Sequence, residues 1–265
     1  MRKYLFLPLS ALPSVGLFFI VLISWFLMSR YSGIPEYLIP GPVSVGRILS
    51  SDWSQLASAM IITLELSLAA FFISVVMGLL LSFTIVQSRI IEKAVMPYVV
   101  LVQIIPFVAI SPLIQLWTGD IYEAVIVLGV IASIFPIVSN SILGLRSIDR
   151  NLHLLFSVYS ASRWQRLWRL LVPGATPNIL NGMVIGITLS LIGVVTGQFI
   201  LSNNVSNGGI SYVILQSEYG LETPLMFAAL FVLTIVGVTL YLIAKAAGRV
   251  VIGRWHQSEQ DIGPN

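Results

Sequence analysis

Long apolar stretches constrain the fold of this sequence more than any other feature. An α-helix needs about 20 consecutive apolar residues to cross a bilayer, whereas membrane β-strands are shorter and alternate in polarity. The apolar stretches here are long and do not alternate, so they predict an all-α integral membrane protein with six transmembrane helices. They cover approximately residues 4–28, 56–86, 94–117, 121–143, 178–201 and 224–247.

Composition supports the membrane assignment and excludes several kinds of site. Apolar residues make up 57% of the chain and charged residues only 9%, whereas a soluble domain has about 25% charged residues. The net charge of +3 gives no reason to expect a nucleic-acid partner. No cysteine is present, which excludes disulfides and thiolate metal sites. His153 and His256 have no second ligand at suitable spacing, so no metal site is expected.

Basic residues concentrate on one side of the six-helix arrangement. Of the 14 lysines and arginines, 12 fall at the two termini, after the second apolar stretch, or between the fourth and fifth. Because loops rich in lysine and arginine stay in the cytoplasm, we expect both termini and the loop Arg146–Arg169 to be cytoplasmic in a multi-pass protein of the cell membrane. The stretch 4–28 is too long for a signal-peptide core and lacks a cleavage site. We expect it to be a retained, peripheral first span.

The loop between the fourth and fifth stretches contains two helical patterns. At 100° per residue, residues 161–172 place Trp164 and Trp168 on an apolar face and the arginines on the opposite face, which is typical of a helix at a membrane surface. We expect Pro173 and Pro177 to bound a turn into the fifth span. Residues 149–160 are apolar on two faces, which favours two packing partners. One partner is expected to be the protein's own spans and the other a second protein.

Three function classes fit a polytopic protein of this kind. A membrane enzyme needs acid, base or metal groups at one depth, and two histidines with one intramembrane carboxylate do not supply such a cluster. A channel or partnerless scaffold does not require a cytoplasmic loop that is apolar on two faces. A transporter that receives force from a separate protein explains that loop, and it is the interpretation that we favour.

Specific motifs resemble the permease subunits of type I ABC importers. Their cytoplasmic signature is Glu-Ala-Ala, three residues, Gly, nine residues and Ile-x-Leu-Pro. With its proline aligned on Pro173, Leu170 and Val172 occupy the Ile and Leu positions. The glycine position is then Ser160, and 154–156, Leu-Leu-Phe, replace Glu-Ala-Ala.

Further fragments, in the right order, resemble the nitrate/sulfonate/taurine branch of this permease family, which includes importers of riboflavin and of thiamine-precursor pyrimidines. They are "IPGP" (Ile39–Pro42), "TLELSLAAFF" (Thr63–Phe72), "QIIPFVAISPLIQLWTG" (Gln103–Gly119), "FPI" (Phe135–Ile137), "LVPGATPNIL" (Leu171–Leu180) and "GISY" (Gly209–Tyr212). The resemblance covers nearly the whole chain, which is therefore expected to be one permease domain, 1–265, with its core spans in 56–247 and a coupling segment at 146–173.

The resemblance implies how such a subunit works and with which partners. The chain has no Gly-Lys-Ser/Thr sequence of a Walker A loop, so ATP and Mg²⁺ are expected in a partner chain and no cofactor in this one. The implied partners are two ABC ATPase subunits, a second permease as homodimer or heterodimer, an extracytoplasmic substrate-binding protein and the lipid bilayer. The chain itself is not expected to be an enzyme. The expected ATPase-coupling residues are Asp149, Arg150, Leu154, Phe156, Val158, Ser160 and Arg163.

Polar residues inside the spans are candidates for the translocation pathway. Glu65 is the one ionisable side chain well inside a span, and such a charge is costly unless it has a function. The alternative is that Glu65 lies near water or pairs with Arg47. The other candidates are equally compatible with hydrogen bonds between helices; they are Gln103, Ser111, Gln115, Asn140, Thr196 and Gln198.

Four glycines repeat along the fifth span at a spacing typical of close helix packing. They are Gly182, Gly186, Gly193 and Gly197. The pattern is compatible with an interface between two permeases or with a pore wall, and the sequence does not choose between them. Nor does it identify the transported substrate, which in this family is selected largely by the binding protein.

Overall fold

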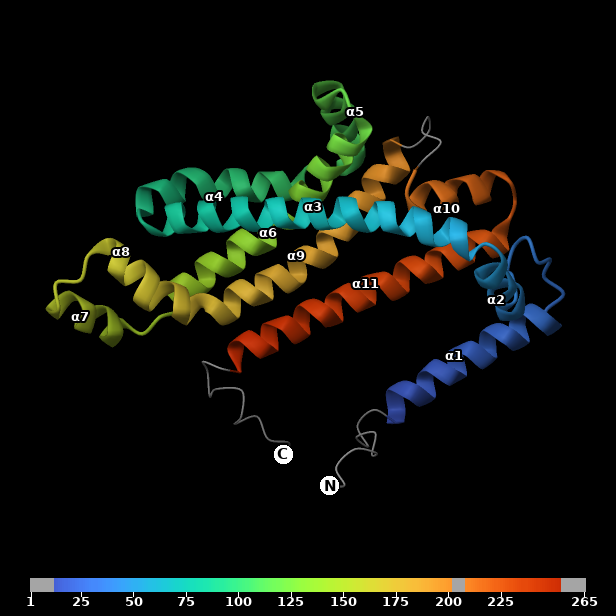
Figure 1. The fold of residues 1–265 in the computed structure, drawn as a ribbon, viewed down its shortest axis with the longest axis horizontal. Helices are drawn as coiled ribbons and strands as arrows, with labels where there is room; N and C mark the ends of the chain where they lie inside the picture. Colours follow the sequence, from blue (N-terminus) through green and yellow to red (C-terminus); the bar gives the residue numbers. More distant parts are fainter. Residues whose placement is uncertain (1–11, 202–207, 254–265) are drawn as a thin grey trace.

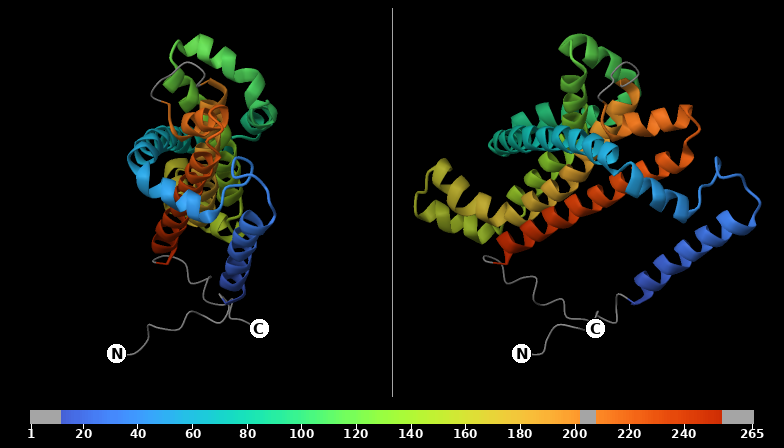
Figure 2. Two further views of the ribbon diagram at one scale, coloured as in Figure 1. Left: turned by 90° about the vertical axis from the view of Figure 1, so that its right-hand side faces the viewer. Right: turned by 45° about the vertical axis from the view of Figure 1, so that its right-hand side comes forward.

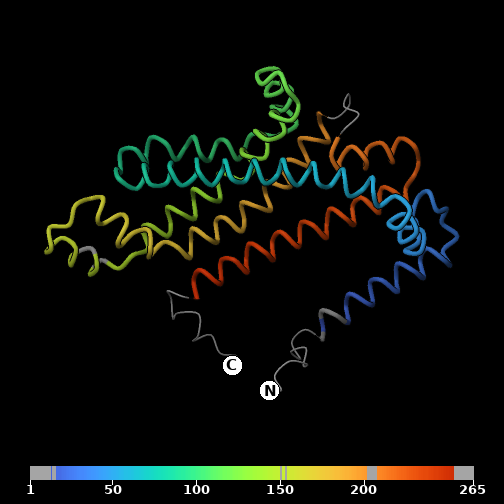
Figure 3. Tube along the Cα trace, viewed as in Figure 1, coloured from blue at the N-terminus to red at the C-terminus, as the bar shows by residue number. Residues whose placement is uncertain are grey.

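The computed structural model describes residues 12–201 and 208–253, and all regular structure in these ranges is helical. Figures 1 and 3 show an elongated bundle in which long helices run side by side and shorter helices cap both ends. The elements are α1 (Leu12–Tyr31), α2 (Pro42–Ser51), α3 (Trp53–Val86), α4 (Arg89–Ile104), α5 (Phe107–Thr118), α6 (Ile121–Arg146), α7 (Arg150–Val158), α8 (Arg163–Arg166), a π-helical turn (Leu167–Leu171), α9 (Val172–Leu201), α10 (Ile210–Tyr219) and α11 (Thr223–Ile252).

Four of these helical segments are long and apolar enough to cross a membrane. They are α3, α6, the continuous helix 163–201 and α11. Helices α4 and α5 together pass the same test, but they bend by 104° at Ile105 and Pro106. The bend follows because proline disfavours a helical residue before it and has no N–H to donate. The described part of the chain therefore has four to five apolar spans, and the predicted span 4–28 begins outside it.

Helices α6 and α9 make the most extensive contact between helices in the described bundle, and the glycines of α9 make it possible. A Cβ atom on Gly193 would lie 2.7 Å from the Cβ of Ala132 and 3.0 Å from the Cα of Gly129. Gly182, Gly186 and Gly197 face α6 in the same way. The glycine repeat therefore packs inside one chain, which excludes the interface between two permeases as its role. Small residues let two backbones approach closely.

Helix α3 joins this pair through a buried face of small and hydroxyl residues. Ser74 and Ser133 share a hydrogen bond of 2.7 Å between α3 and α6, and the hydroxyl of Ser82 donates to the carbonyl of Val138 at 3.3 Å. Ala70 contacts the position where Gly129 has no side chain. The centre of the bundle is thus three helices, α3, α6 and α9, held by close packing and by hydrogen bonds between spans.

Helix α1 lies at the edge of the molecule. Figure 2 shows it separated from the other long helices along most of its length. Its contacts are made near its C-terminal end, where the ring of Trp25 stacks on Phe227 at 6.2 Å and its Nε1 donates to the carbonyl of Pro40. Most of its other described apolar side chains, including Phe18 and Phe19, are exposed and suit contact with lipid or another chain.

The two ends of the bundle differ in charge. The end that carries α7, α8 and the α3–α4 turn holds most of the described basic residues, among them Arg89, Arg146 and Arg249. The end that carries α2 and α10 holds Asp52, Glu218 and Glu222. The first end is called the basic end below, and the second the acidic end.

Candidate functional site

Helix α7 projects beyond the long helices at the basic end (Figure 1). Asp149 starts it as an N-cap, with its Oδ1 accepting a hydrogen bond from the backbone N–H of Asn151 at 2.8 Å. Such a cap satisfies a free N–H at the helix start. The helix is short because it ends in a second, equally specific motif at Ser160.

Ser160 adopts the left-handed backbone conformation, with φ of 50°. Its N–H donates to the carbonyl of Ser157 and the N–H of Ala161 donates to the carbonyl of Phe156, both at 3.0 Å. This pair of bonds is a Schellman motif, in which the left-handed position is usually glycine. The resemblance aligns Ser160 with the glycine of the permease signature, and the left-handed conformation seen here is one that glycine adopts without strain.

Both faces of α7 are open. Leu154 and Val158 are 55% and 81% exposed, and on the other side Leu155 and Tyr159 are 49% and 79% exposed. Among the side chains of α7 that the structure describes, Phe156 alone is half-buried. The expectation that one face packs on the protein's own spans is therefore wrong for this chain by itself. The helix exposes apolar side chains on two faces, which is costly in water unless a partner covers them.

The segment after α7 is joined to the fifth span without a break. Ser162 and Gln165 form a capping box that starts α8, and the helix continues to Leu201. The predicted turn at Pro173 and Pro177 is absent, because a π-helical turn at 167–171 precedes Pro173. A π-turn is wider than an α-turn, and here it accommodates a residue that lacks an N–H.

The base of this segment is packed into the bundle. Leu167 and Leu171 are buried against Leu145 of α6 and Phe83 of α3. The guanidinium of Arg166 donates to the hydroxyl of Ser157 at 3.1 Å, which ties α7 to α8. The observed arrangement is an exposed apolar helix on a rigid stem that is continuous with a membrane span.

The polar residues predicted for a pathway lie in different environments. Glu65 and Gln103 are exposed, and no ion pair joins Glu65 to Arg47 within residues 12–201 and 208–253. Gln115 and Thr196 are half-buried. Ser111 is fully buried in α5. The hydroxyls of Ser111 and Thr196 donate to backbone carbonyls of their own helices, and within the described ranges no hydrogen bond joins any two of these five residues.

Asn140 and Gln198 contact partners that the sequence reasoning did not identify. The side chain of Asn181 donates to Asn140 Oδ1 at 3.2 Å and joins α9 to α6. Gln198 is 3% exposed and accepts a bond from the hydroxyl of Thr63 at 3.0 Å. These bonds agree with the alternative of interhelical hydrogen bonding that the sequence left open.

Thr63 is the centre of a junction at the acidic end. Its hydroxyl donates to Gln198 of α9 and accepts from the backbone N–H of Ile210, at the start of α10, at 2.9 Å. A Cβ atom on Gly209 would lie 2.2 Å from the Thr63 hydroxyl, so this position requires glycine. The signal that could have identified Thr63 is its place on the small-residue face of α3, one turn before Ser67.

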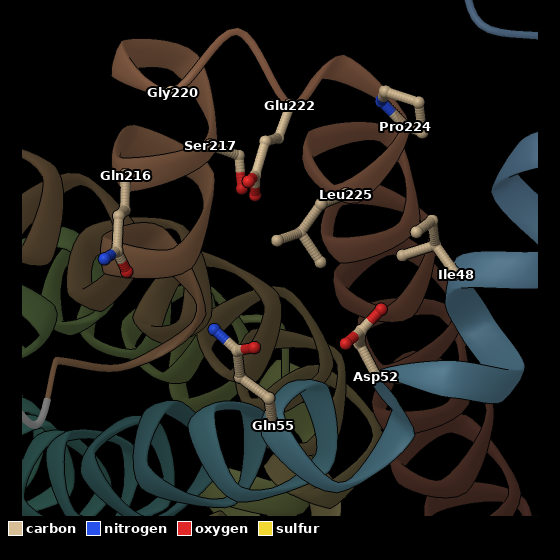
Figure 4. A pocket seen from close by; sticks show the side chains of 9 residues that line it. All are labelled: Ile48, Asp52, Gln55, Gln216, Ser217, Gly220, Glu222, Pro224 and Leu225. Atoms are coloured by element: carbon tan, nitrogen blue, oxygen red, sulfur yellow. The ribbon is translucent and has the colours of Figure 1, made fainter.

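A cavity of about 600 Å³ opens at the acidic end between α2, α3, α10 and α11. Figure 4 shows Asp52 and Gln55 on one side of it and Gln216, Ser217 and Glu222 on the other. Apolar side chains of Ile48, Pro224 and Leu225 share its walls with the polar ones, and the cavity lies at the opposite end of the spans from α7. Within the described ranges, no group of three or more His, Cys, Asp or Glu residues is placed to hold a metal ion.

Comparisons with known proteins place this geometry in context. The model of a family described as "Binding-protein-dependent transport system inner membrane component" matches residues 74–257. A formylaminopyrimidine transport permease protein, ThiX, of Halalkalibacterium halodurans is 29% identical and covers 92% of this chain and 96% of its own length. The riboflavin transport system permease protein RibX of Chloroflexus aurantiacus is 31% identical over 93% of this chain and 92% of its own.

Solved structures show the same fold at lower identity. A chain of the methionine ABC transporter MetNI in an inward-facing conformation superposes with a TM-score of 0.65 at 19% identity, over 74% of this chain and 95% of its own. A chain of a bacterial ABC transporter involved in the import of alginate superposes with a TM-score of 0.66 at 19% identity, over 91% of this chain and 94% of its own.

Proposed function

The chain belongs to the family of binding-protein-dependent transport system inner membrane components and is a membrane permease subunit of an ABC importer, and we propose that residues 149–173 couple it to a separate ATPase. The observation that carries the proposal is α7. It exposes apolar side chains on two faces, and its stem continues without a break into the span α9.

In this mechanism the partner covers α7 and moves it. Burial of Leu154 and Val158 by an ATPase removes their apolar surface from water, which supplies the free energy of docking. The stem 163–171 is held by Leu167 and Leu171 in the bundle, so displacement of α7 is transmitted to α9 and, through its glycines, to α6. The proposed contact residues are Asp149, Arg150, Leu154, Phe156, Val158, Ser160 and Arg163.

The proposed assembly is that of the family as a whole. Two ATPase subunits bind ATP and Mg²⁺, two permeases form the pathway, and a binding protein delivers the substrate from outside. The docking surface for the ATPase is the basic end, which is accordingly cytoplasmic. Because α3, the α4–α5 pair, α6, α9 and α11 supply five spans, we propose α1 as a sixth and peripheral one, with both termini in the cytoplasm and one domain over 1–265.

The pathway is proposed to use the polar side chains that remain accessible within one chain. Glu65 and Gln103 are exposed on the helix surface, and Gln115, Asn140 and Thr196 are half-buried. For Ser111 and Gln198, which are buried, the proposed role is to hold helices that border the pathway. An exposed carboxylate in a span is costly against lipid, which favours a water-filled surface for Glu65.

The cavity with Asp52 and Glu222 is proposed to lie under the docked binding protein, because it opens at the end opposite α7. For the cargo we propose a small nitrogen heterocycle. The relatives named for formylaminopyrimidine and riboflavin are 29% and 31% identical over more than nine-tenths of this chain, whereas the taurine permease protein TauC of Escherichia coli is 24% identical over a similar share. The ligand of the cognate binding protein tests this directly.

The coupling proposal is tested by placing charges on α7. In the assembled transporter, Leu154→Asp combined with Val158→Asp should lower substrate-stimulated ATPase activity by at least about tenfold, because a carboxylate buried without a partner costs more than the ~1.4 kcal/mol of a tenfold change. The matched control is Tyr219→Asp with Leu221→Asp, two exposed residues at the acidic end. Co-purification of the ATPase, measured for both variants, should fall for the α7 variant and stay unchanged for the control. Normal coupled transport by the α7 variant would reject the docking face.

A further inference from the structure

A second cavity lies at the basic end, between the last turns of α3, the first turn of α4 and the stem of α8. Its volume is about 520 Å³. We refer to it as the stem cavity. It is lined by Leu80, Phe83, Thr84, Gln87, Ile91, Arg163, Trp164, Leu167 and Trp168. We propose that the stem cavity binds an anionic phospholipid, with the phosphate at Arg163 and an acyl chain along Leu80, Phe83 and Leu167.

The polarity of the stem cavity changes along its length. Along α3 the lining runs from Leu80 and Phe83 to Gln87, which lies at the end of the helix next to the α3–α4 turn. The stem runs in the opposite sense, from Arg163 at the basic end to Leu167 and then into the span. The polar groups of both elements therefore lie at the same end of the cavity and the apolar groups at the other. A phospholipid has this same order of headgroup and chain.

The tryptophans of the stem favour a position at the membrane surface. Trp164 and Trp168 are 70% and 56% exposed, although α8 and the π-turn are joined directly to a span. The ring of Trp168 lies 6.2 Å from the ring of Phe83. Tryptophan is enriched at headgroup level, where its ring contacts chains and its N–H contacts polar groups. The two rings thus form one wall of the cavity at the depth of a lipid headgroup.

The charges around the cavity favour an anion. Arg163 is the one charged side chain in its lining, and no carboxylate is among the lining residues. Glu92, the nearest acid along α4, is held in an ion pair by Arg146. Within the described ranges no hydrogen bond or ion pair fixes the guanidinium of Arg163, whereas Arg166 is bound to Ser157. A free guanidinium above an apolar cavity at a cytoplasmic surface is the arrangement that binds lipid phosphate.

A lipid explains the cavity better than the ATPase does. An ATPase in the cytoplasm reaches α7, which extends beyond the spans, but Leu80, Phe83 and Leu167 belong to the ends of apolar helices. An acyl chain reaches that depth and a soluble protein does not. The inference requires that the chain lies in a bilayer. Of the proposed coupling residues it involves only Arg163, whose guanidinium it assigns to the lipid phosphate instead of to the ATPase.

The test uses brominated lipids, which quench tryptophan fluorescence on contact. The full-length chain with Trp25, Trp53, Trp117 and Trp255 each changed to Phe keeps only the two stem tryptophans as reporters. It is placed in phosphatidylcholine vesicles that contain the same fraction of brominated phosphatidylglycerol or of brominated phosphatidylcholine. One basic residue near the surface is worth about fivefold in affinity for an anionic lipid, so phosphatidylglycerol should quench with an association constant about fivefold higher.

Variants at Arg163 identify the source of this preference. Arg163→Gln should abolish it and Arg163→Lys should retain it, because lysine keeps the charge. The matched control is Arg249→Gln in the last turn of α11, an exposed arginine at the same end but outside the stem cavity, which should leave the preference unchanged. Equal quenching by the two lipids, or a preference that survives Arg163→Gln, would overturn the proposal.

A further experiment distinguishes a lipid from the ATPase as the occupant of the stem cavity. When the partner ATPase is bound, the preference for phosphatidylglycerol should persist. Loss of quenching by both lipids on assembly would show that the ATPase covers this surface and would overturn the proposal. Because the first measurements need no ATPase, a failure of the coupling proposal leaves their result unaffected.

Discussion

The α6–α9 pair and helix α7 are both apolar, but the pair buries its apolar surface within the chain and α7 leaves its apolar surface exposed. In the pair, glycines bring two backbones together until a single added carbon on Gly193 would lie 2.7 Å from Ala132. In α7, nine residues extend outside the bundle and leave Leu154 and Val158 mostly exposed. The apolar contact of the α6–α9 pair is made within one chain, whereas the apolar faces of α7 have no such contact.

The difference indicates where the molecule is rigid and where it receives another protein. A close-packed glycine contact has no room to adjust, so α6 and α9 are expected to move as one body. Helix α7 has capping motifs at both ends that hold its shape but little packing that holds its position. A stable shape with open faces is typical of a docking element. Substitutions can be chosen that affect one region and spare the other.

The largest effect is expected from Gly193→Ala. The added Cβ would lie within 3.0 Å of the Leu128 carbonyl and the Gly129 Cα as well as close to Ala132, and overpacking of this kind costs about 1–3 kcal/mol. The midpoint of thermal unfolding, followed by tryptophan fluorescence in detergent, should fall by several degrees.

The control for Gly193→Ala is Gly46→Ala in α2. A Cβ atom at Gly46 meets nothing within 4 Å, and alanine favours the helix by up to about 1 kcal/mol over glycine. This variant should be neutral or slightly more stable. Equal stability of the two variants would show that α6 and α9 can move apart to accommodate the added carbon more easily than the distances indicate.

A loss of stability of similar size is expected from Thr63→Val, which tests whether the rigid region extends to α10. Valine keeps the shape of threonine but removes the bonds to Gln198 and to the N–H of Ile210. An unsatisfied buried group costs about 1–3 kcal/mol. Hydrogen exchange at the start of α10 should speed up. Thr234→Val removes only a bond within α11 and should leave that exchange unchanged; an equal effect of both would argue against the junction.

The smallest effect is expected from Ser160→Gly, and it has the opposite sign. A left-handed conformation costs a residue with a side chain about 1–2 kcal/mol, so glycine should stabilise the end of α7 by about 1 kcal/mol. Ala161→Gly, one position later, lacks this benefit and serves as the control. The rate of proteolysis between α7 and α8 measures both. Faster cleavage of the Ser160→Gly variant than of the original chain would contradict the Schellman motif at Ser160.

The sequence predicted the spans and the amphipathic stem because hydrophobic periodicity is a local property. Trp164 and Trp168 lie on an exposed, apolar surface as their spacing indicates, and five of the predicted stretches match helices or a bent helix pair. The resemblance to the permease family is confirmed by the family match. These features depend on residues that are close together in the chain.

Features that depend on distant residues were not predictable. The spacing of the α9 glycines indicates close approach, but it does not say whether α6 or another subunit approaches. The junction of Thr63 and Gln198 joins positions 135 residues apart, and a threonine inside an apolar span gives no sign of its partner. The turn expected at Pro173 and Pro177 is absent for a different reason. A π-turn in the preceding residues, 167–171, compensates for the N–H that Pro173 lacks, so the helix continues.

That π-turn also allows the stem to hold one more residue than an α-helix of the same length. The backbone N–H of Val172 donates to the carbonyl of Leu167, five residues earlier, where an α-helix would use the residue four earlier. The wider turn absorbs the additional residue without interrupting the helix 163–201. Within this turn Leu167, Leu170 and Leu171 are all buried. One surplus residue therefore adds an apolar anchor between the stem and the bundle, at the point where movement of α7 would enter the span.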